Sequence, residues 1–118
     1  MGGVEAEWEN NVGEGWWPIC VQLHLELLTL DPDYKIAQVK EKFGGLRFYL
    51  EAGTAEMWHA VERAERRAGA TCEVCGEPGT NEPVLDWYST LCAVDRRAWA
   101  RRAKARSATD SVSGKEAQ

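Results

Sequence analysis

Three cysteines in the C-terminal third of the chain stand at the spacing of a metal site, and this pattern constrains the fold more than any other feature. Cys72 and Cys75 form a Cys-x-x-Cys pair followed by Gly76, and sixteen residues separate Cys75 from Cys92. Zinc sites of the form C-x2-C-x15–20-C-x2-C have this spacing, with a fourth cysteine at the position that Asp95 occupies here. A carboxylate oxygen can complete the tetrahedron around zinc. We therefore predict that Cys72, Cys75, Cys92 and Asp95 hold a structural zinc ion.

The segments around these residues predict a treble-clef-like zinc lobe over residues 71–106. The Cys-x-x-Cys turn folds back around the metal, and residues 84–91 can form a short hairpin. Cys92 and Asp95 then fall in the first turn of a helix, where residues three apart lie on one face and can reach a single ion. A knuckle, a hairpin and a helix that carries the second ligand pair are the parts of a treble clef.

The sequence leaves alternatives to this ligand set open. Glu73 or a distant histidine can supply the fourth ligand in place of Asp95, and the thiols can form a disulfide or stay free. A disulfide is disfavoured in a reducing compartment, and the sequence shows no export signal. A structural zinc contributes about 10 kcal/mol or more to folding, which is large against the small core of so short a chain. No histidine or glutamate follows at a spacing suited to activate a metal-bound water, so we expect a structural metal and no enzymatic activity.

The chain of 118 residues is short enough for one domain. Its acidic, glycine-rich start predicts a flexible leader, and its last twelve residues, which are poor in apolar side chains, predict a disordered tail. Between them we expect an α/β half and then the zinc lobe. The four expected segments are residues 1–15, 16–70, 71–106 and 107–118.

Tryptophans near the start of the chain are candidates for binding a protein partner. Trp8 lies among glutamates and glycines, and a large apolar indole is unexpected in such a solvated segment. Trp8 either folds back onto the domain or anchors a partner, because tryptophan is enriched at interface hot spots. We group Trp16 and Trp17 with it as the predicted partner-binding residues.

Residues 16–70 combine helical and strand patterns, which predicts an α+β fold. Over residues 18–30 apolar side chains recur at helical spacing in two neighbouring stripes, so broad that this helix is expected to be mostly buried. Two β-favourable runs flank the dipeptide Gly44-Gly45, which suits the tight turn of a hairpin. Thr54 can cap a second helix of about residues 55–68.

The net charge of −5 hides a strong segregation of charge along the chain. The first 34 residues hold seven acids and no base, whereas residues 87–106 hold six bases against one acid. The acidic total disfavours unspecific nucleic-acid binding, but a local basic stripe can still contact phosphates. A solvated sheet face is the simpler explanation for the bases of the hairpin. For the helix, complementing its own dipole and attraction to the acidic segments of the chain are simpler, since no aromatic platform accompanies its bases. The candidate nucleic-acid-binding residues are Lys40, Lys42 and Arg47 in the hairpin and Arg97, Arg101 and Arg102 in the basic helix.

One stretch of the chain resembles a known group of proteins. The segment Val39–Tyr49, VKEKFGGLRFY, is followed by the Cys-x-x-Cys-Gly knuckle and by a later cysteine. Over roughly residues 13–96 the chain thereby resembles small bacteriophage and prophage zinc-motif proteins, a group with no assigned activity. Its members end the second ligand pair with histidine, where this chain has Asp95. The resemblance implies a phage context and a bacterial cytoplasm.

These patterns predict an α+β domain made of a helix, a β-hairpin, a second helix and the zinc lobe with its basic helix. No apolar run approaches the ~20 residues of a membrane helix, so we expect no membrane partner. We predict a non-enzymatic phage or prophage accessory protein, stabilised by zinc, that binds a host or phage protein in the cytoplasm. The alternative is a nucleic-acid-binding zinc module that uses the hairpin over residues 40–47 and the basic helix over residues 96–106.

Overall fold

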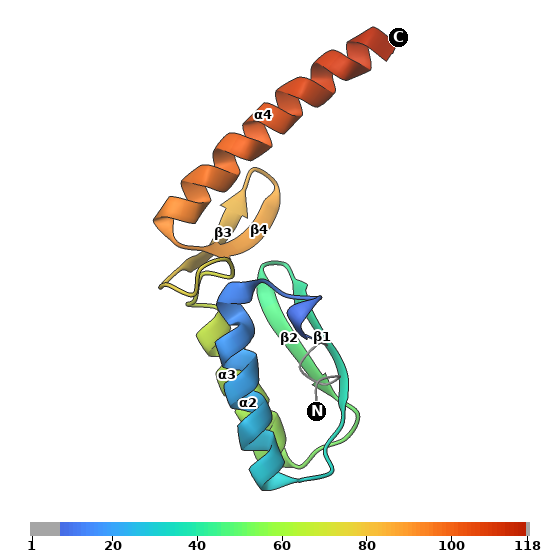
Figure 1. Cartoon of the computed structure of the whole chain (residues 1–118), viewed down its shortest axis with the longest axis vertical. Helices are drawn as coiled ribbons and strands as arrows, with labels where there is room; N and C mark the ends of the chain where they lie inside the picture. The colour runs from blue at the N-terminus through green and yellow to red at the C-terminus, as the bar shows by residue number, and fades with distance from the viewer. Residues whose placement is uncertain (1–7, 118) are drawn as a thin grey trace.

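The computed structural model describes residues 8–117, with side chains described through residue 106, as two helices on a hairpin followed by a second hairpin and a long helix (Figure 1). This is the α+β class that the sequence predicts, with the elements in the predicted order. No helix in this part of the chain combines the length and apolarity that crossing a bilayer requires. The elements are a 3₁₀ turn, η1 (Glu14–Trp16), α2 (Trp17–Leu30), β1 (Ile36–Lys42), β2 (Gly45–Leu50), α3 (Ala55–Ala68), β3 (Thr80–Val84), β4 (Trp87–Leu91) and α4 (Ala93–Ala117).

Helices α2 and α3 lie antiparallel and side by side against the β1–β2 hairpin (Figure 1). The side chains of β2 alternate, because Leu46, Phe48 and Leu50 are buried while Tyr49 between them is exposed. Cys20 of α2 is a small core residue, and burial raises the pKa of its thiol to about 12. The main core buries Trp8, Val12, Trp16, Ile19, Cys20, Leu23, Leu27, Val39, Leu46, Phe48, Leu50, Met57, Ala60, Val61, Ala64 and Ala68.

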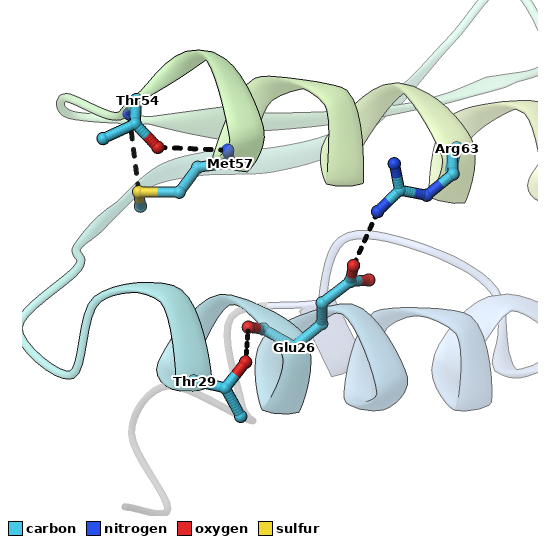
Figure 2. Close-up of polar contacts among 5 residues, drawn as sticks. All are labelled: Glu26, Thr29, Thr54, Met57 and Arg63. Carbon is cyan, nitrogen blue, oxygen red and sulfur yellow. Dashed lines mark hydrogen bonds and ion pairs between the residues drawn. The ribbon is translucent and has the colours of Figure 1, made fainter.

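Helix α3 begins and ends where the sequence predicts. The Thr54 hydroxyl caps it by accepting a hydrogen bond from Met57 N at 3.3 Å, and the Met57 sulfur accepts one from Thr54 N (Figure 2). Gly69 follows its last residue as the C-cap. On the outer side Arg63 forms an ion pair with Glu26 of α2 at 2.6 Å (Figure 2). Both side chains are well exposed, so this pair contributes at most about 1 kcal/mol.

Residues 8–15 belong to the folded body, and the prediction of a flexible leader is wrong for them. Trp8 and Trp16 are almost completely buried in the main core. The Trp16 indole N–H donates to Ala68 O at 3.1 Å and to Thr71 O at 2.8 Å. Trp8 and Trp16 are therefore core residues and not the predicted partner anchors, because packing removes both indoles from solvent. The part of the predicted leader before residue 8 lies outside the described residues.

The outer face of α2 also departs from the prediction of a mostly buried helix. Leu23 and Leu27 of one apolar stripe are fully buried, but Val21 and Leu25 of the second stripe are 41% and 57% exposed. Trp17, the third predicted partner-binding residue, is half-buried beside them and lines a shallow groove on this face. The second stripe faces solvent because α3 and the hairpin cover only one side of α2.

The turn of the first hairpin is shifted by one residue from the predicted Gly44-Gly45. Phe43 and Gly44 form the two-residue turn with φ angles of 54° and 77°, and Gly45 already pairs with Lys42 in the ladder. Positive φ at both central residues is what a type I′ hairpin turn requires. Phenylalanine is uncommon at such an angle, so contacts from outside the hairpin must hold it there.

Those contacts come from the second hairpin and join the two halves of the molecule. The Thr90 hydroxyl donates to Gly44 O at 2.6 Å, and the Asn81 side chain donates to Phe43 O at 3.2 Å. A side chain at position 44 has no room, because its Cβ would lie 2.9 Å from the backbone nitrogen of Ser89. The VKEKFGGLRFY segment thus carries both the hairpin and its docking point.

The C-terminal lobe consists of the β3–β4 hairpin and α4. The strands pair antiparallel from Thr80 opposite Leu91 to Val84 opposite Trp87, so the hairpin begins four residues earlier than the predicted residue 84. Beyond its first turns α4 extends away from the rest of the molecule (Figure 1). It continues as a helix over residues 107–117, the segment for which the sequence predicts a disordered tail. Residue 118 of the predicted tail lies outside the described residues.

Candidate metal centre

The knuckle and the first turn of α4 bring the four predicted ligands together. Gly76, with a φ angle of 83°, closes the knuckle by donating from its N–H to Cys72 O at 2.9 Å. Cys92 directly precedes α4, and its sulfur accepts a hydrogen bond from Asp95 N at 3.4 Å. One ligating atom from each of Cys72, Cys75, Cys92 and Asp95 lies within 4.8 Å of the other three. These four side chains therefore form a potential metal site.

The distances within the cluster suit a metal better than a disulfide. The sulfur atoms of Cys75 and Cys92 are 3.8 Å apart, and Asp95 Oδ2 lies 3.3 Å from the sulfurs of Cys72 and Cys92. A tetrahedral zinc with Zn–S bonds of about 2.3 Å separates two sulfurs by about 3.8 Å and a sulfur and an oxygen by about 3.5 Å. Disulfide sulfurs lie about 2.05 Å apart. All four cysteines of the chain are free thiols in the structure.

Asp95, and not Glu73, is the fourth member of the cluster. Hydrogen bonds donated by the thiols of Cys72 and Cys92 hold the pKa of Asp95 below its usual range. The Glu73 carboxylate is used elsewhere, because it accepts a hydrogen bond from Thr90 N at 3.0 Å.

The two histidines lie outside the cluster, so neither is the distant fourth ligand considered from the sequence. His24 is buried in the main core, where its Nδ1 and the Tyr34 hydroxyl share a hydrogen bond. Burial raises the pKa of Tyr34 to about 12. His59 is exposed on α3.

Glu73 holds the knuckle against both halves of the molecule. Its backbone N–H donates to Thr90 O at 2.9 Å, and its backbone carbonyl accepts from Gly15 N at 3.0 Å. Burial raises the pKa of the Glu73 carboxyl, and the hydrogen bond from Thr90 opposes that shift. The backbone at Gly15 approaches so closely that a Cβ there would lie 2.1 Å from Cys72 O. The spacing of the cluster is thus set by hydrogen bonds that reach into the N-terminal half.

The hydrophobic core of the C-terminal lobe is very small. Among the described residues its buried members are Cys72, Val84 and Leu91, with Trp99 and Ala103 packed partly against them. Complete burial of a valine or leucine contributes about 1.5–3 kcal/mol, so these residues alone give the lobe little stability. A metal that joins the knuckle to α4 would supply the stability that this core lacks.

Arg96 fixes the start of α4 on the second hairpin, a role that the sequence did not indicate. Its guanidinium donates to Glu82 O at 3.1 Å and to Thr80 O at 2.5 Å. Because these bonds occupy its donors, Arg96 is a structural residue and not part of the free basic surface of α4. Nothing local to the sequence separates it from the neighbouring Arg97, since the difference depends on which carbonyls lie nearby.

The predicted nucleic-acid-binding residues form two groups, one on the β1–β2 hairpin and one on α4, with the β3–β4 hairpin between them (Figure 1). Lys40 and Arg47 lie directly opposite one another on β1 and β2, on the face away from the core, and Lys42 is exposed near the turn. The bases of α4 form the other group. Its predicted members Arg97, Arg101 and Arg102 are all exposed.

Trp87 lies between these two groups and was not among the candidate residues of the sequence. It is 69% exposed and lines a cleft of about 530 Å³ with Trp99, Arg102 and Arg106 of α4, here called the Trp87 cleft. The expectation that no aromatic platform accompanies the bases is therefore wrong. Trp87 is fifteen residues from Arg102 in the sequence, and only the packing of the hairpin against α4 brings them together.

Trp87 also lines a second cleft, of about 460 Å³, between the tips of the two hairpins, here called the tip cleft. Lys42, Phe43 and Tyr88 contribute to it, and Phe43 is 71% exposed. Two acids, Glu41 and Asp86, line the same cleft.

Compared with models of protein families, with curated proteins and with solved structures, the chain matches none of them. The geometry of the cysteine cluster and of the surfaces around α4 is therefore the basis for a functional assignment.

Proposed function

We propose that this protein is a non-enzymatic, zinc-stabilised module that binds nucleic acid, encoded by a bacteriophage or prophage and active in the cytoplasm of a bacterial host. The nucleic-acid part of the proposal rests on the surface of α4. Between residues 96 and 106 this helix carries no acid, and all of its bases except Arg96 are exposed. The phage context rests on the resemblance of the VKEKFGGLRFY segment and the cysteine pattern. The exposed bases are Arg97, Arg101, Arg102, Lys104 and Arg106.

None of these five bases is in an ion pair within the part of the chain whose side chains are described, although Arg102 interacts electrostatically with Asp95. The ion pair in that part joins Arg63 to Glu26, far from α4. Exposed bases on a projecting helix are available to phosphates, and each contact with duplex DNA contributes about 0.9 to the slope of log K against log salt. Five contacts would give a slope of about −4.5.

A charge-reversal experiment tests this proposal. The double variant Arg101→Glu with Arg102→Glu is expected to abolish electrophoretic retardation of DNA or RNA and to lower the salt slope. The matched control is Arg66→Glu with Arg67→Glu, which changes the net charge equally at two exposed residues of α3. Equal loss of binding in both variants would show that only the net charge matters and would contradict a binding surface on α4.

Zinc is the metal that we propose for the cysteine cluster. Three thiolates and one carboxylate are ligands that zinc accepts in tetrahedral sites, and the spacing of the sulfurs fits such a site. Cys72 and Cys75 would hold the ion from the knuckle, and Cys92 and Asp95 would hold it from α4. Bound there, zinc would act as a structural cross-link between the two.

Elemental analysis of the purified protein tests the metal. We expect about one zinc per chain, lost in Cys75→Ser and retained in Cys20→Ala, a control at the cysteine that is buried in the main core. Zinc absent from the unmodified chain, or present equally in both variants, would contradict the proposed site.

Binding to a host or phage protein is a second candidate, favoured by the outer face of α2. Val21 and Leu25 expose apolar surface there beside the half-buried Trp17. A partner that docks on this face should be captured in stoichiometric amount by the unmodified chain and lost with Leu25→Glu. Capture that Leu25→Glu leaves unchanged would exclude this face as the docking site.

A further inference from the structure

We propose that Trp87 is the stacking platform of a site for single-stranded nucleic acid, in which Arg102 and Arg106 bind phosphate and the tip cleft extends the strand's path. The inference rests on the proposed nucleic-acid binding and adds the form of nucleic acid and the residue that selects it. It adds Trp87 and the tip cleft to the bases of α4, so the stacking part can fail while that binding stands.

The Trp87 cleft combines an aromatic face with two cations. Trp87 is the most exposed tryptophan of the described chain, and the half-buried Trp99 lines the same cleft. Arg102 and Arg106 are four residues apart on α4 and therefore project from the same face of the helix. Guanidinium groups bind phosphate oxygens in pairs of parallel hydrogen bonds. The cleft therefore offers a nucleotide an aromatic ring for its base and guanidinium groups for its phosphate.

The tip cleft adjoins the Trp87 cleft, because Trp87 lines both. Phe43 and Tyr88 are 71% and 49% exposed, and the Lys42 ammonium lies 5.7 Å from the centre of the Phe43 ring. Phe43 is the first of the two turn residues and has a positive φ angle. Glu41 and Asp86 also line this cleft, so the phosphates are expected nearer α4 and the bases nearer the tips.

This arrangement favours a single strand over a duplex. Stacking on tryptophan needs an exposed base face, and in a duplex each base face is already covered by its neighbours. Aromatic side chains interleaved with bases are the usual surface for unpaired strands, whereas a basic helix alone binds any phosphate backbone. The two clefts share Trp87, so a strand that crosses both must pass over its ring.

The test compares a short oligothymidylate of about 10 nucleotides with a duplex of the same length, by fluorescence anisotropy at two salt concentrations. We expect the single strand to bind more tightly, and Trp87→Ala to weaken that binding about 5- to 150-fold. Trp87→Phe should restore most of the affinity, since phenylalanine keeps a stacking face. Trp58→Ala removes another exposed tryptophan, on α3, and should have no effect.

A second variant guards against loss of structure at position 87. Phe43→Asn removes the ring in the tip cleft and keeps a residue that tolerates the positive φ angle of the turn. It should weaken single-strand binding without changing duplex binding. Unchanged thermal unfolding of each variant shows that the fold is kept.

The outcomes separate this inference from the proposed function. If Trp87→Ala and Phe43→Asn leave single-strand binding unchanged while reversal of Arg101 and Arg102 abolishes it, stacking is refuted and the binding surface on α4 stands. If neither the single strand nor the duplex binds at low salt, both proposals fail. If polyglutamate displaces the single strand as well as free oligothymidylate does, simple charge attraction replaces the stacking site.

Discussion

Replacing Gly44 by alanine tests whether backbone contact locks the two halves of the molecule together. Gly44 has a φ angle of 77°, and a Cβ there would lie 2.6 Å from Asn81 Nδ2 and 2.9 Å from Ser89 Cα. The Asn81 side chain can swing away, but the backbone at Ser89 is held in the β3–β4 ladder. The alanine variant must therefore move the turn away from the second hairpin.

The cost of this movement can be worked out from the contacts at the turn. A left-handed backbone angle costs a residue with a Cβ about 1–2 kcal/mol. Retreat of the turn breaks the bonds from Thr90 to Gly44 O and from Asn81 to Phe43 O, each with a net contribution of about 0.5–1.5 kcal/mol. We expect Gly44→Ala to lower the free energy of unfolding by about 2–5 kcal/mol.

Urea denaturation followed by circular dichroism measures this change, and the chain supplies its own control in the next residue. Gly45 has no positive φ angle, and the nearest atom to its Cβ position is Lys42 O at an ordinary 3.5 Å. Gly45→Ala should therefore change the free energy of unfolding by less than about 1 kcal/mol. A loss of unfolding free energy below about 1 kcal/mol for Gly44→Ala, or equal losses at both positions, would refute the idea that backbone contact at Gly44 holds the two halves together.

Three further predictions follow from the core and the metal cluster. Asp95→His should tighten zinc binding, because three thiolates and an imidazole are a common structural zinc set. Competition with a chelator measures the zinc affinity, and equal or weaker binding by the variant would contradict the prediction. Trp16→Phe should lower the free energy of unfolding by about 1–3 kcal/mol, because it leaves two backbone carbonyls without their indole donor. Trp58→Phe is the matched control, and an equal loss of stability in both variants would argue against those hydrogen bonds. Stability should be full below pH 9 and fall as pH rises toward 12, because burial raises the pKa of Cys20 and of Tyr34 to about 12 while the unfolded chain ionises earlier. Denaturation at stepped pH measures this fall, and a flat profile over that range would contradict it.

The elements that the sequence predicts well are those with local signals. Thr54 before an amphipathic stripe and Gly69 after it bracket α3 because capping and helical spacing act within a few residues. The metal cluster could be predicted for the same kind of reason. A knuckle and a first helical turn each place two ligands through spacing alone, so Cys72 and Cys92 needed only to be brought together by the fold.

The features that the sequence missed all depend on long-range packing. Trp8 is buried because its ring packs near His24 and Phe48. No pattern in the first fifteen residues predicts these contacts. The turn falls on Phe43 and Gly44 because Thr90 holds the Gly44 carbonyl from another hairpin. The Trp87 cleft requires the angle at which α4 leaves the lobe, a tertiary feature that spacing does not encode.

The close backbone contact between Gly15 and the knuckle has a consequence for engineering the protein. Main-chain atoms of the knuckle rest directly on main-chain atoms of η1, so no side chain there can be enlarged or trimmed to adjust the fit. A knuckle, hairpin and helix transplanted alone into a foreign scaffold would leave the Glu73 carbonyl without its Gly15 donor. Grafts of this cysteine cluster should therefore take the short η1 segment and the Phe43–Gly44 turn with them as one cassette.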